Sequence, residues 1–253
     1  MLSIRGVEIG RGRPKVCLPI VGQTLTEIKK QTEQVKHQDA ELAEWRVDFF
    51  LGQDIETTLS EIRTILGSMP LIVTFRSKEE GGAQAITDQA YLQLYQIVIK
   101  SGLADIIDVE LKRSEVVRDQ IISMAQQHDV ATIVSNHDFT KTPAKEELIN
   151  RLKEAELIGA SISKLAVMPQ QVSDVLSLLE VTHEISQKSQ IPIVTMAMGG
   201  LGLLSRLSGE VFGSSITFAS AGQASAPGQI NCDAIGPVLD LIHQNLEELD
   251  KSV

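Results

Sequence analysis

The sequence predicts an α/β protein of the (β/α)8, or TIM-barrel, class, and three observations support this prediction. Short apolar segments rich in β-branched residues alternate with amphipathic segments along the 253-residue chain. Eight such pairs follow one another, with strand starts roughly 24–35 residues apart, which suits barrel repeats. No GxGxxG turn follows the first predicted strand, VCLPIV. An open doubly wound sheet, the alternative fold, is expected to carry that turn.

The predicted strands are brief apolar runs bounded by polar or turn-forming residues. They begin near Val16, Leu42, Leu71, Ile106, Ala131, Ile162, Ile191 and Ser215. The predicted helices place apolar residues on one face at a period of about 3.6 residues. They cover Leu25–Val35, Ile55–Leu66, Asp88–Ser101, Glu115–Gln127, Ala144–Leu157, Gln170–Gln187, Leu201–Leu207 and Cys232–Leu249.

The segment before the first barrel strand has a pattern of its own. Residues 2–14 alternate short apolar and polar residues around glycines, which predicts a small β-hairpin. No low-complexity linker interrupts the remainder. Residues 1–253 are therefore expected to form one barrel domain that carries the hairpin at its N-terminus.

Composition and charge exclude several classes of function. The chain has 43% hydrophobic residues, which is enough for one large core. Its net charge is −10 and it has no polybasic run, so nucleic acid is not an expected partner. It lacks a signal-like start and any run of ~18 apolar residues, so we expect a cytoplasmic protein without membrane contact. Cys17, Cys232 and the five histidines lack metal-ligand spacing, so we expect no metal.

One lysine, Lys164, lies inside the apolar run SISKLAVM at residues 161–168. A run of this kind suits a strand that is buried on both faces. Burial disfavours the charged form of an amine, and an uncharged lysine is a good nucleophile toward a carbonyl group. The alternative is a lysine at a strand end that reaches solvent or pairs with an acid.

Ionisable residues gather where the predicted strands end, and in a TIM barrel these ends form the rim at which chemistry takes place. Glu44, Arg46 and Asp48 share one parity, so they are expected on one face of their strand. A contribution to folding stability does not explain why so many ionisable residues gather at this rim, because buried charges cost several kcal/mol unless they are paired. The rim residues are Glu44, Arg46, Asp48, Arg76, Glu80, Asp108, Glu110, Ser135, His137, Lys164, Arg206, Ser225 and Gln229.

Taken singly, several rim residues also have structural interpretations. A carboxylate and an arginine on one strand can form an ion pair, and arginines are mostly surface residues. A histidine beside an Asp turn can be a plain loop residue, and two acids on one strand can serve only to hold a charge network. These interpretations apply to Glu44 with Arg46, to Arg76, Arg206 and His137, and to Asp108 with Glu110.

Taken together, the rim residues narrow the reaction class. A neutral amine at Lys164 forms an imine with a ketone, which makes the neighbouring carbon acidic. His137 is then suited to be the base, and Glu80 to orient it. Arginines on the rim of an acidic protein indicate an anionic substrate, and Glu44 adds an acceptor for hydroxyl groups. These residues suggest imine chemistry on a polyhydroxylated keto acid, ending either in C–C cleavage or in loss of water.

Six motifs of the chain resemble those of the type I 3-dehydroquinate dehydratases, the 3-dehydroquinases of the shikimate pathway. In chain order they are EWRVD (44–48), TFRSKEEGG (74–82), SNHDF (135–139), KLAVMP (164–169), MAMGGLGLLSR (196–206) and ASAPGQI (224–230). The resemblance runs the full length of the chain, with the same order and similar spacing.

This resemblance implies a (β/α)8 lyase that converts 3-dehydroquinate to 3-dehydroshikimate by syn elimination of water through a lysine Schiff base. It also implies a homodimer, no metal or organic cofactor, and an N-terminal hairpin that closes the bottom of the barrel. Lys164 would form the imine, and His137, paired with Glu80, would move the protons. The substrate would be bound at its ring hydroxyls by Glu44, Arg46 and Arg76, and at its carboxylate by Arg206, Ser225 and Gln229.

The segment after the last predicted strand, SAGQASAPGQ (220–229), is rich in small residues. Such a composition suits a loop that moves over a site. The resemblance implies that residues 222–229, with Gly222, Pro227 and Gly228, act as a lid.

Two other functions are alternatives at this point. A class I aldolase or transaldolase also uses a barrel lysine, and the rim arginines would then bind a phosphate. A catalytically silent relative would bind the same metabolite without turnover. The six motifs do not suit the first alternative, and the second usually lacks the nucleophile or the base, both of which this chain has.

Overall fold

The computed structural model of the protein describes residues 1–222 and 225–250, apart from the side chains of residues 248–250. Its main sheet has eight parallel strands in the order β10-β3-β4-β5-β6-β7-β8-β9. Nearly every strand thus pairs with its neighbours in sequence, as in a TIM barrel. The strands are β3 (Lys15–Ile20), β4 (Leu42–Arg46), β5 (Leu71–Thr74), β6 (Ile106–Glu110), β7 (Ala131–Asp138), β8 (Ile162–Val167), β9 (Ile193–Ala197) and β10 (Ile216–Phe218).

The ring closes between its last two strands. The three residues of β10 pair with β3 on one side. On the other side, the two residues before β10 join the sheet to β9: Ser214 forms a bridge with Ile193, and Ser215 N donates to Ile193 O at 2.8 Å. We call this junction the β9–β10 seam. The predicted TIM-barrel class is confirmed.

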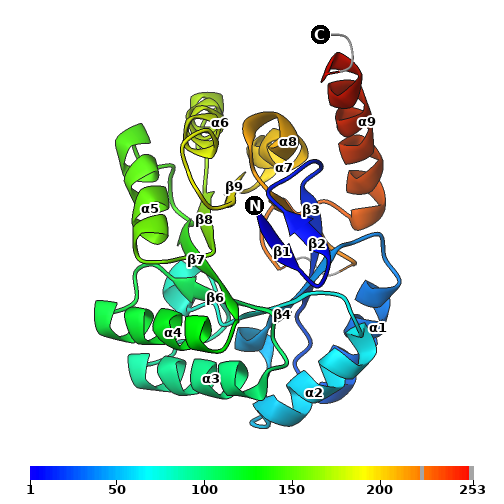
Figure 1. Ribbon diagram of the computed structural model, residues 1–253, viewed down its shortest axis with the longest axis vertical. Helices are drawn as coiled ribbons and strands as arrows, with labels where there is room; N and C mark the ends of the chain where they lie inside the picture. Colours follow the sequence, from blue (N-terminus) through cyan, green and yellow to red (C-terminus); the bar gives the residue numbers. More distant parts are fainter. Residues whose placement is uncertain (223–224, 251–253) are drawn as a thin grey trace.

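Helices surround the barrel, as Figure 1 shows. Thr24, Asp54 and Thr87 begin the first three, because their side chains accept hydrogen bonds from backbone N–H groups of the first turn. The one-turn α8 (Gly209–Phe212) was not predicted, and no helix in the described ranges is long and apolar enough to cross a membrane. The other helices are α1 (Leu25–Lys36), α2 (Ile55–Leu66), α3 (Asp88–Ser101), α4 (Glu115–Gln127), α5 (Lys145–Leu157), α6 (Val172–Ser186), α7 (Leu203–Leu207) and α9 (Cys232–Asp250).

Strand alternation builds the barrel interior in layers. Alternate side chains of a strand face opposite sides of the sheet. Near the amino ends of the strands a buried apolar cluster includes Cys17, Leu42, Ile72, Ile106, Ile133, Ile162, Val194 and Ile216. Two residues further along five of these strands, the same parity brings polar side chains into the next layer: Glu44, Thr74, Asp108, Ser135 and Lys164. The polar layer therefore lies toward the carboxyl ends of the strands.

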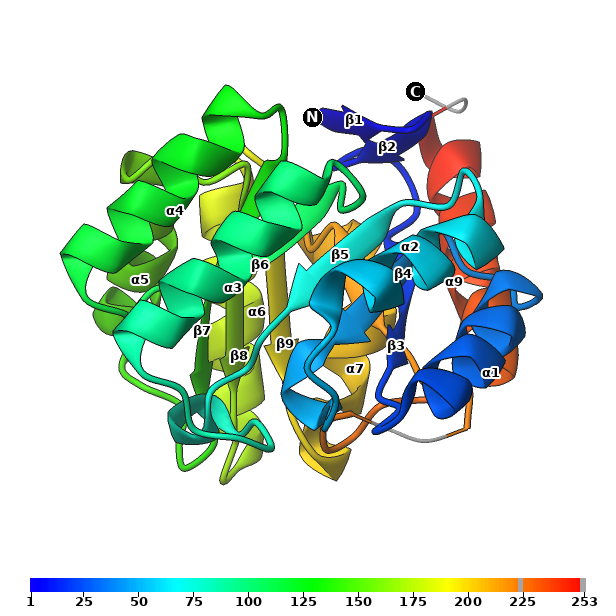
Figure 2. The same cartoon turned by 90° about the horizontal axis from the view of Figure 1, so that it is seen from below.

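The N-terminal hairpin covers the amino end of the barrel, as predicted. Strands β1 (Leu2–Ile4) and β2 (Val7–Ile9) are antiparallel, and their apolar side chains pack on the apolar cluster of the interior. Figure 2 shows the hairpin across one end of the barrel. At its turn, Arg5 Nε donates to Asp105 Oδ1 at 2.6 Å, and Arg63 Nη2 donates to Asp105 Oδ2 at 2.6 Å. This ion-pair cluster ties the hairpin to the barrel.

The end of β4 differs from the prediction that Glu44, Arg46 and Asp48 share one strand face. The strand ends at Arg46, and Asp48 lies in the 3-10 helix η1 (Val47–Phe49). There the buried Asp48 carboxylate accepts hydrogen bonds from the backbone N–H groups of Arg76, at 3.2 Å, and Ala83, at 3.0 Å. The chain turns because these donors, in the segment after β5, satisfy the carboxylate.

Candidate active site

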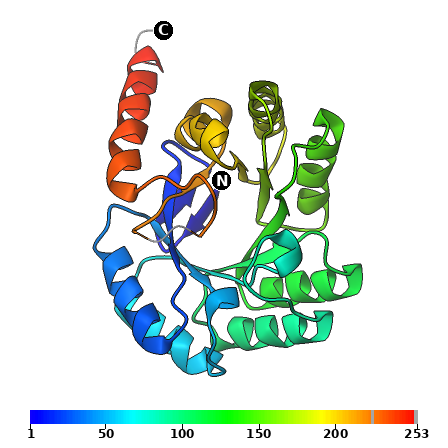
Figure 3. The same cartoon turned by 180° about the vertical axis from the view of Figure 1, so that it is seen from behind.

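A pocket opens at the carboxyl end of the barrel strands, on the side viewed in Figure 3. Apolar side chains form part of its wall: Phe139, Ala166, Met196, Met198 and Phe218. The structure also brings all of the predicted site residues to this pocket: Lys164, His137, Glu80, Glu44, Arg46, Arg76, Arg206, Ser225 and Gln229. Their individual roles remain predictions.

Lys164 is buried in the pocket, with 6% of its surface exposed. Its Nζ donates to Asp108 Oδ2 at 3.0 Å and lies 4.0 Å from Glu44 Oε1. The amine also lies 4.3 Å from the centre of the Phe218 ring. The amine thus lies among one hydrogen-bonded carboxylate, a second carboxylate and an aromatic ring.

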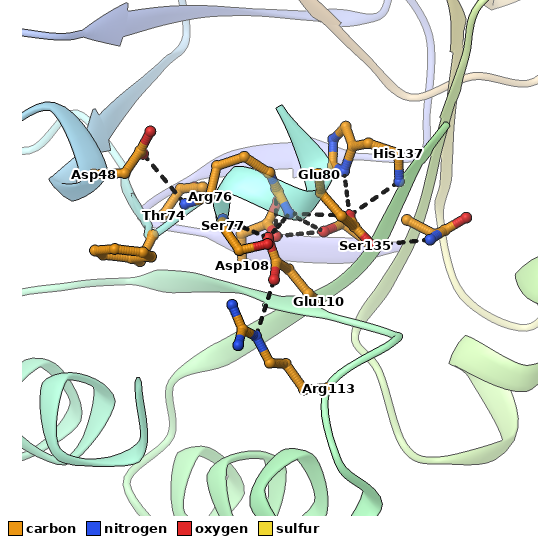
Figure 4. A network of polar contacts seen from close by, with 12 residues as sticks. Asp48, Thr74, Arg76, Ser77, Glu80, Asp108, Glu110, Arg113, Ser135 and His137 are labelled. Carbon is orange, nitrogen blue, oxygen red and sulfur yellow. Dashed lines mark hydrogen bonds and ion pairs between the residues drawn. The ribbon is translucent and has the colours of Figure 1, made fainter. Parts of the chain in front are cut away.

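Arg76 joins the acids of β6 into one network, shown in Figure 4. Its Nη2 donates to Asp108 Oδ1 at 2.8 Å, and its Nη1 donates to Glu110 Oε1 at 3.2 Å and to Ser135 Oγ at 3.0 Å. Burial opposes ionisation of Asp108, but the charges of Arg76 and Lys164 hold the pKa of this carboxyl well below its usual range. Asp108 and Glu110 thus take part in one charge network with Arg76.

His137 and Glu80 form an acid–base pair. Glu80 lies in the 3-10 helix η2 (Lys78–Glu80), and its Oε2 is 2.9 Å from His137 Nδ1 and 3.0 Å from the His137 backbone N. Burial raises the pKa of Glu80 to about 7, although Arg76 opposes this rise. Burial and the charges of Arg76 and Lys164 lower the pKa of His137 well below its ordinary value. The lowered pKa favours the neutral imidazole, and in that form a proton on Nδ1 can be donated to an ionised Glu80.

Arg46 does not pair with Glu44. Its Nε and Nη2 instead donate to the two carboxylate oxygens of Asp48, each at 2.8 Å. Glu44 Oε1 accepts a hydrogen bond from Thr74 Oγ1 at 2.8 Å. The Glu44–Arg46 ion pair considered from the sequence is thus replaced by a bidentate Arg46–Asp48 pair, which leaves Glu44 beside Lys164.

Arg206 is a buried cation without a carboxylate partner in the described part of the chain. It is 2% exposed, so it is not the surface arginine that the structural interpretation allowed. Its Nη1 donates to Phe218 O at 3.3 Å and its Nη2 to Pro227 O at 3.1 Å, whereas its Nε has no hydrogen-bond partner. Burial lowers the pKa of Arg206 to about 10, which leaves it charged at neutral pH. A buried charge without a counterion suits an anionic ligand.

The segment between β10 and α9 brings Ser225 and Gln229 to Arg206. Ser225 N donates to Gln229 Oε1 at 2.8 Å, and Gln229 Nε2 donates to Ser225 Oγ at 3.0 Å. Gly228 has a φ of +78°, and a Cβ there would lie 2.6 Å from Gly199 O. This close backbone contact holds the described residues 225–229 against the end of β9. Residues 223–224 of the predicted lid lie outside the described residues.

Phe218 is not among the predicted site residues, although its ring borders Lys164. The available signal was parity, because Phe218 lies two residues after the inward-facing Ile216 on β10. The contact between Lys164 and Asp108 had no signal in the sequence, since it joins residues 56 positions apart on β6 and β8. Long-range pairs of this kind depend on strand register and side-chain conformation.

The site combines a lysine, a histidine–carboxylate pair and an unpaired arginine in the mouth of a (β/α)8 barrel, which defines a barrel enzyme for small anionic carbonyl compounds. Comparison with known proteins identifies the family. The family model for type I 3-dehydroquinase matches residues 16–246. A 3-dehydroquinate dehydratase from Listeria welshimeri is 46% identical over 245 residues, which cover 95% of this chain and 97% of that protein. The chain belongs to the type I 3-dehydroquinase family.

Solved structures agree with this assignment. A crystal structure of type I 3-dehydroquinate dehydratase from Clostridium difficile, with covalently modified comenic acid, matches with a TM-score of 0.94 and 42% identity over 96% of this chain and 98% of that chain. The 3-dehydroquinate dehydratase from Geobacillus kaustophilus matches with a TM-score of 0.93 and 38% identity over 96% of each chain. The fold around the site is therefore shared with these enzymes.

Proposed function

We propose that the protein dehydrates 3-dehydroquinate to 3-dehydroshikimate, a step of the shikimate pathway, by syn elimination of water through a Schiff base on Lys164. The observation that carries this proposal is one pocket that contains an amine, a histidine base and an unpaired arginine: Lys164, His137 and Arg206.

Imine formation comes first. The amine of Lys164, the ketone of the substrate and one proton give a protonated imine and one molecule of water. The nitrogen loses a proton after it attacks the carbonyl carbon, and His137 Nε2 can accept that proton and deliver one to the departing hydroxyl group. Asp108 accepts a hydrogen bond from Lys164 Nζ at 3.0 Å and holds the nitrogen in place until the substrate arrives.

Elimination follows on the adjacent carbons. His137 removes a proton from the carbon next to the imine, and the C–H electrons form a C=C bond as the imine electrons move to nitrogen. The enamine electrons then expel the hydroxyl group from the next carbon, and His137 returns its proton so that water leaves. Glu80 stabilises the imidazolium between these steps. Hydrolysis of the imine consumes one water, releases the enone and frees Lys164, so the net change is the loss of one water.

The remaining pocket residues orient the substrate in this proposal. The substrate carboxylate binds Arg206, whose Nε lacks a partner, together with Ser225 and Gln229. The ring hydroxyls contact Glu44 and the guanidinium groups of Arg46 and Arg76. Residues 222–229 act as a lid, and the hydrogen bonds from Arg206 to Pro227 O and from Arg46 to Ser225 O, at 3.1 and 3.5 Å, support this role.

Borohydride trapping tests the proposal. The protein is mixed with 3-dehydroquinate, reduced and digested, and the ultraviolet absorbance of the enone is followed in a parallel sample. We expect turnover and a reduced adduct on the peptide that contains Lys164. Lys141→Met, at an exposed position outside the pocket, serves as the matched control and should trap normally. Turnover by a preparation whose Lys164 peptide stays unmodified would exclude the Schiff base.

We also infer that the protein acts as a homodimer in the cytoplasm. Exposed apolar side chains on three helices support an interface between two copies of the chain. They are Val172 and Leu176 on α6, Leu201 on η3 (Gly200–Gly202) and Leu204 on α7. Sedimentation at micromolar concentration tests this inference. We expect a dimer that Leu176→Glu with Leu204→Glu converts to a monomer, whereas a wild-type monomer would exclude it.

A further inference from the structure

A chain of hydrogen bonds runs from an outer helix to the acid–base pair of the site. On α5, Arg151 Nη1 donates to Asn136 Oδ1 at 2.6 Å. Asn136 Nδ2 donates to Glu80 Oε1 at 2.9 Å. The other oxygen of Glu80 accepts from His137 Nδ1 and from the His137 backbone, at 2.9 and 3.0 Å. The chain thus links an arginine outside the pocket to the proposed base.

The arginine determines which way the Asn136 amide points. A guanidinium group only donates hydrogen bonds, so it requires the amide oxygen on its side. The amide nitrogen must then face Glu80, where it donates to an acceptor. Without the arginine, rotation of the amide by half a turn would place its oxygen against the carboxylate. That orientation is compatible only with a protonated Glu80, because two acceptors repel each other.

The hydrogen bond from Asn136 to Glu80 is important because both side chains are buried. Asn136 is 1% exposed and Glu80 is 4% exposed, so water cannot readily replace a lost donor. The Arg151 side chain is 11% exposed, and its second partner, Glu147, belongs to the same helix. Within the described residues, the contact with Asn136 is its one hydrogen bond to a barrel strand. Helix α5 therefore reaches the site through this side chain.

We propose that Arg151, acting through Asn136, is a positioning residue that keeps Glu80 ionised and thereby fixes the proton of His137 on Nδ1, with Nε2 as the base. The inference rests on the proposed function for its catalytic meaning, but its electrostatic part concerns the free protein. It adds a residue on an outer helix to the machinery of the site. The amide oxygen, the carboxylate and the imidazole then have one consistent set of donors and acceptors.

Several charged groups face Glu80 and set the background for this effect. From the end of β5, Arg76 Nη1 lies 3.6 Å from Glu80 Oε2 and favours ionisation. From β6, the carboxylates of Asp108 and Glu110 oppose it. From β7, His137 contributes the donor on Nδ1. Since Arg76 and the β6 acids oppose each other, loss of the Asn136 donor is expected to shift the balance measurably.

The test is an NMR titration of the His137 ring in the free protein, which requires no substrate. His137→Gln identifies the signals of this ring among the five histidines. In Arg151→Met the donor is lost and the stem is kept, so we expect the midpoint of the Glu80–His137 pair to rise by about one pH unit. Asn136→Ala should raise it similarly, and Arg151→Met should add no further shift in the Asn136→Ala background.

Two control variants separate positioning from helix packing. Arg118 on α4 is also largely buried, but it contacts Leu111, Asp119 and Glu154, none of which lines the pocket. Arg118→Met should therefore leave the midpoint unchanged. Arg151→Lys still donates to the amide oxygen and should keep the wild-type midpoint. An unchanged or lowered midpoint in Arg151→Met, or an equal rise in Arg118→Met, would overturn the proposal.

A folding failure of Arg151→Met does not end the test. Arg151→Lys and Asn136→Ala are then compared, and the proposal requires the wild-type midpoint in the first and a raised midpoint in the second. A lysine variant that shifts as far as Asn136→Ala overturns it. If the protein turns over 3-dehydroquinate, the acidic limb of kcat/KM should move with the NMR midpoint. Absence of turnover in the wild type would instead reject the proposed function and leave the titration valid.

Discussion

The two ends of the barrel both contain buried or half-buried charged groups, but these groups differ in whether the protein supplies their counterions. At the amino end, Asp105 accepts hydrogen bonds from Arg5, Arg63 and the backbone N–H of Leu71, at 2.6, 2.6 and 2.8 Å. The donors come from the hairpin, from α2 and from the start of β5. At the carboxyl end, Arg206 has no carboxylate among the described residues, and it lines a pocket.

This difference distinguishes charged groups that stabilise the fold from charged groups that bind a ligand. A charged group whose partners all belong to the protein stabilises the arrangement of its elements. A buried charge that lacks a counterion is costly in the free protein and favours a ligand that supplies one. The variants below test this contrast, starting with the largest expected effect.

Lys164→Met should lower kcat/KM for 3-dehydroquinate by at least about 10⁴-fold, because the side chain keeps its bulk but loses the nucleophile. Steady-state kinetics by enone absorbance measures the effect. Asp108 keeps its contact with Arg76, so circular dichroism should show a folded barrel. Retention of a tenth of the wild-type rate would remove Lys164 from the mechanism.

Arg206→Met should raise KM by about 10- to 100-fold, with a smaller change in kcat, since a charge-assisted hydrogen bond contributes roughly 1.5–3 kcal/mol. Arg63→Met, the same change at the amino end, should leave KM unchanged and reduce stability instead. An unchanged KM in Arg206→Met would show that the unpaired cation does not bind the substrate.

The pH dependence of kcat/KM should have an acidic limb near pH 7. Burial raises the pKa of Glu80 to about 7, and a protonated Glu80 lacks the negative charge that stabilises the imidazolium of His137 during proton transfer. The rate therefore rises with pH through this value, and it falls about tenfold for each unit below it. Profiles of the wild type and of Glu80→Gln measure the limb. A limb that persists unchanged in Glu80→Gln would assign it to another group.

Asp105→Asn should have the smallest effect on activity, with kcat and KM within about twofold of the wild type. It weakens two charged contacts, so we expect the free energy of unfolding to fall by about 1–3 kcal/mol in urea titrations. Asp108→Asn is the matched change at the other end, and it should reduce both stability and kcat/KM. Equal losses of activity in the two variants would contradict the division between the ends.

Much of the fold could be predicted because each strand–helix repeat of the barrel has its own pattern of apolar and polar residues. The helices at Ile55–Leu66, Asp88–Ser101 and Glu115–Gln127 have the predicted bounds, since apolar spacing defines them and side-chain caps begin the first two. Strand parity places Glu44 and Lys164 in one layer, and the other predicted site residues lie at or after strand ends on the same rim. These features are local in sequence, or they repeat with the period of the strand.

What could not be predicted depends on contacts between distant residues. Asp48 leaves the face of β4 because backbone donors after β5 bind its carboxylate. The proximity of Asp108 to Lys164 depends on the register of two strands with β7 between them. The orientation of Asn136 depends on an arginine of the following helix. No pattern along the chain encodes such pairings.

Arg206 also has a structural role at the β9–β10 seam. Arg206 O accepts a hydrogen bond from Thr217 Oγ1 at 2.9 Å, and its guanidinium group contacts Met196 Sδ on β9, at 3.9 Å, and Phe218 O on β10. Arg206 thus adds contacts across a junction where Ser214 and Ser215 are hydrogen-bonded to Ile193 and Thr195. If an anion binds Arg206 only when this junction is closed, anion affinity and the free energy of local opening are thermodynamically linked, and we expect the Ser215 amide hydrogen to exchange more slowly in occupied than in free protein.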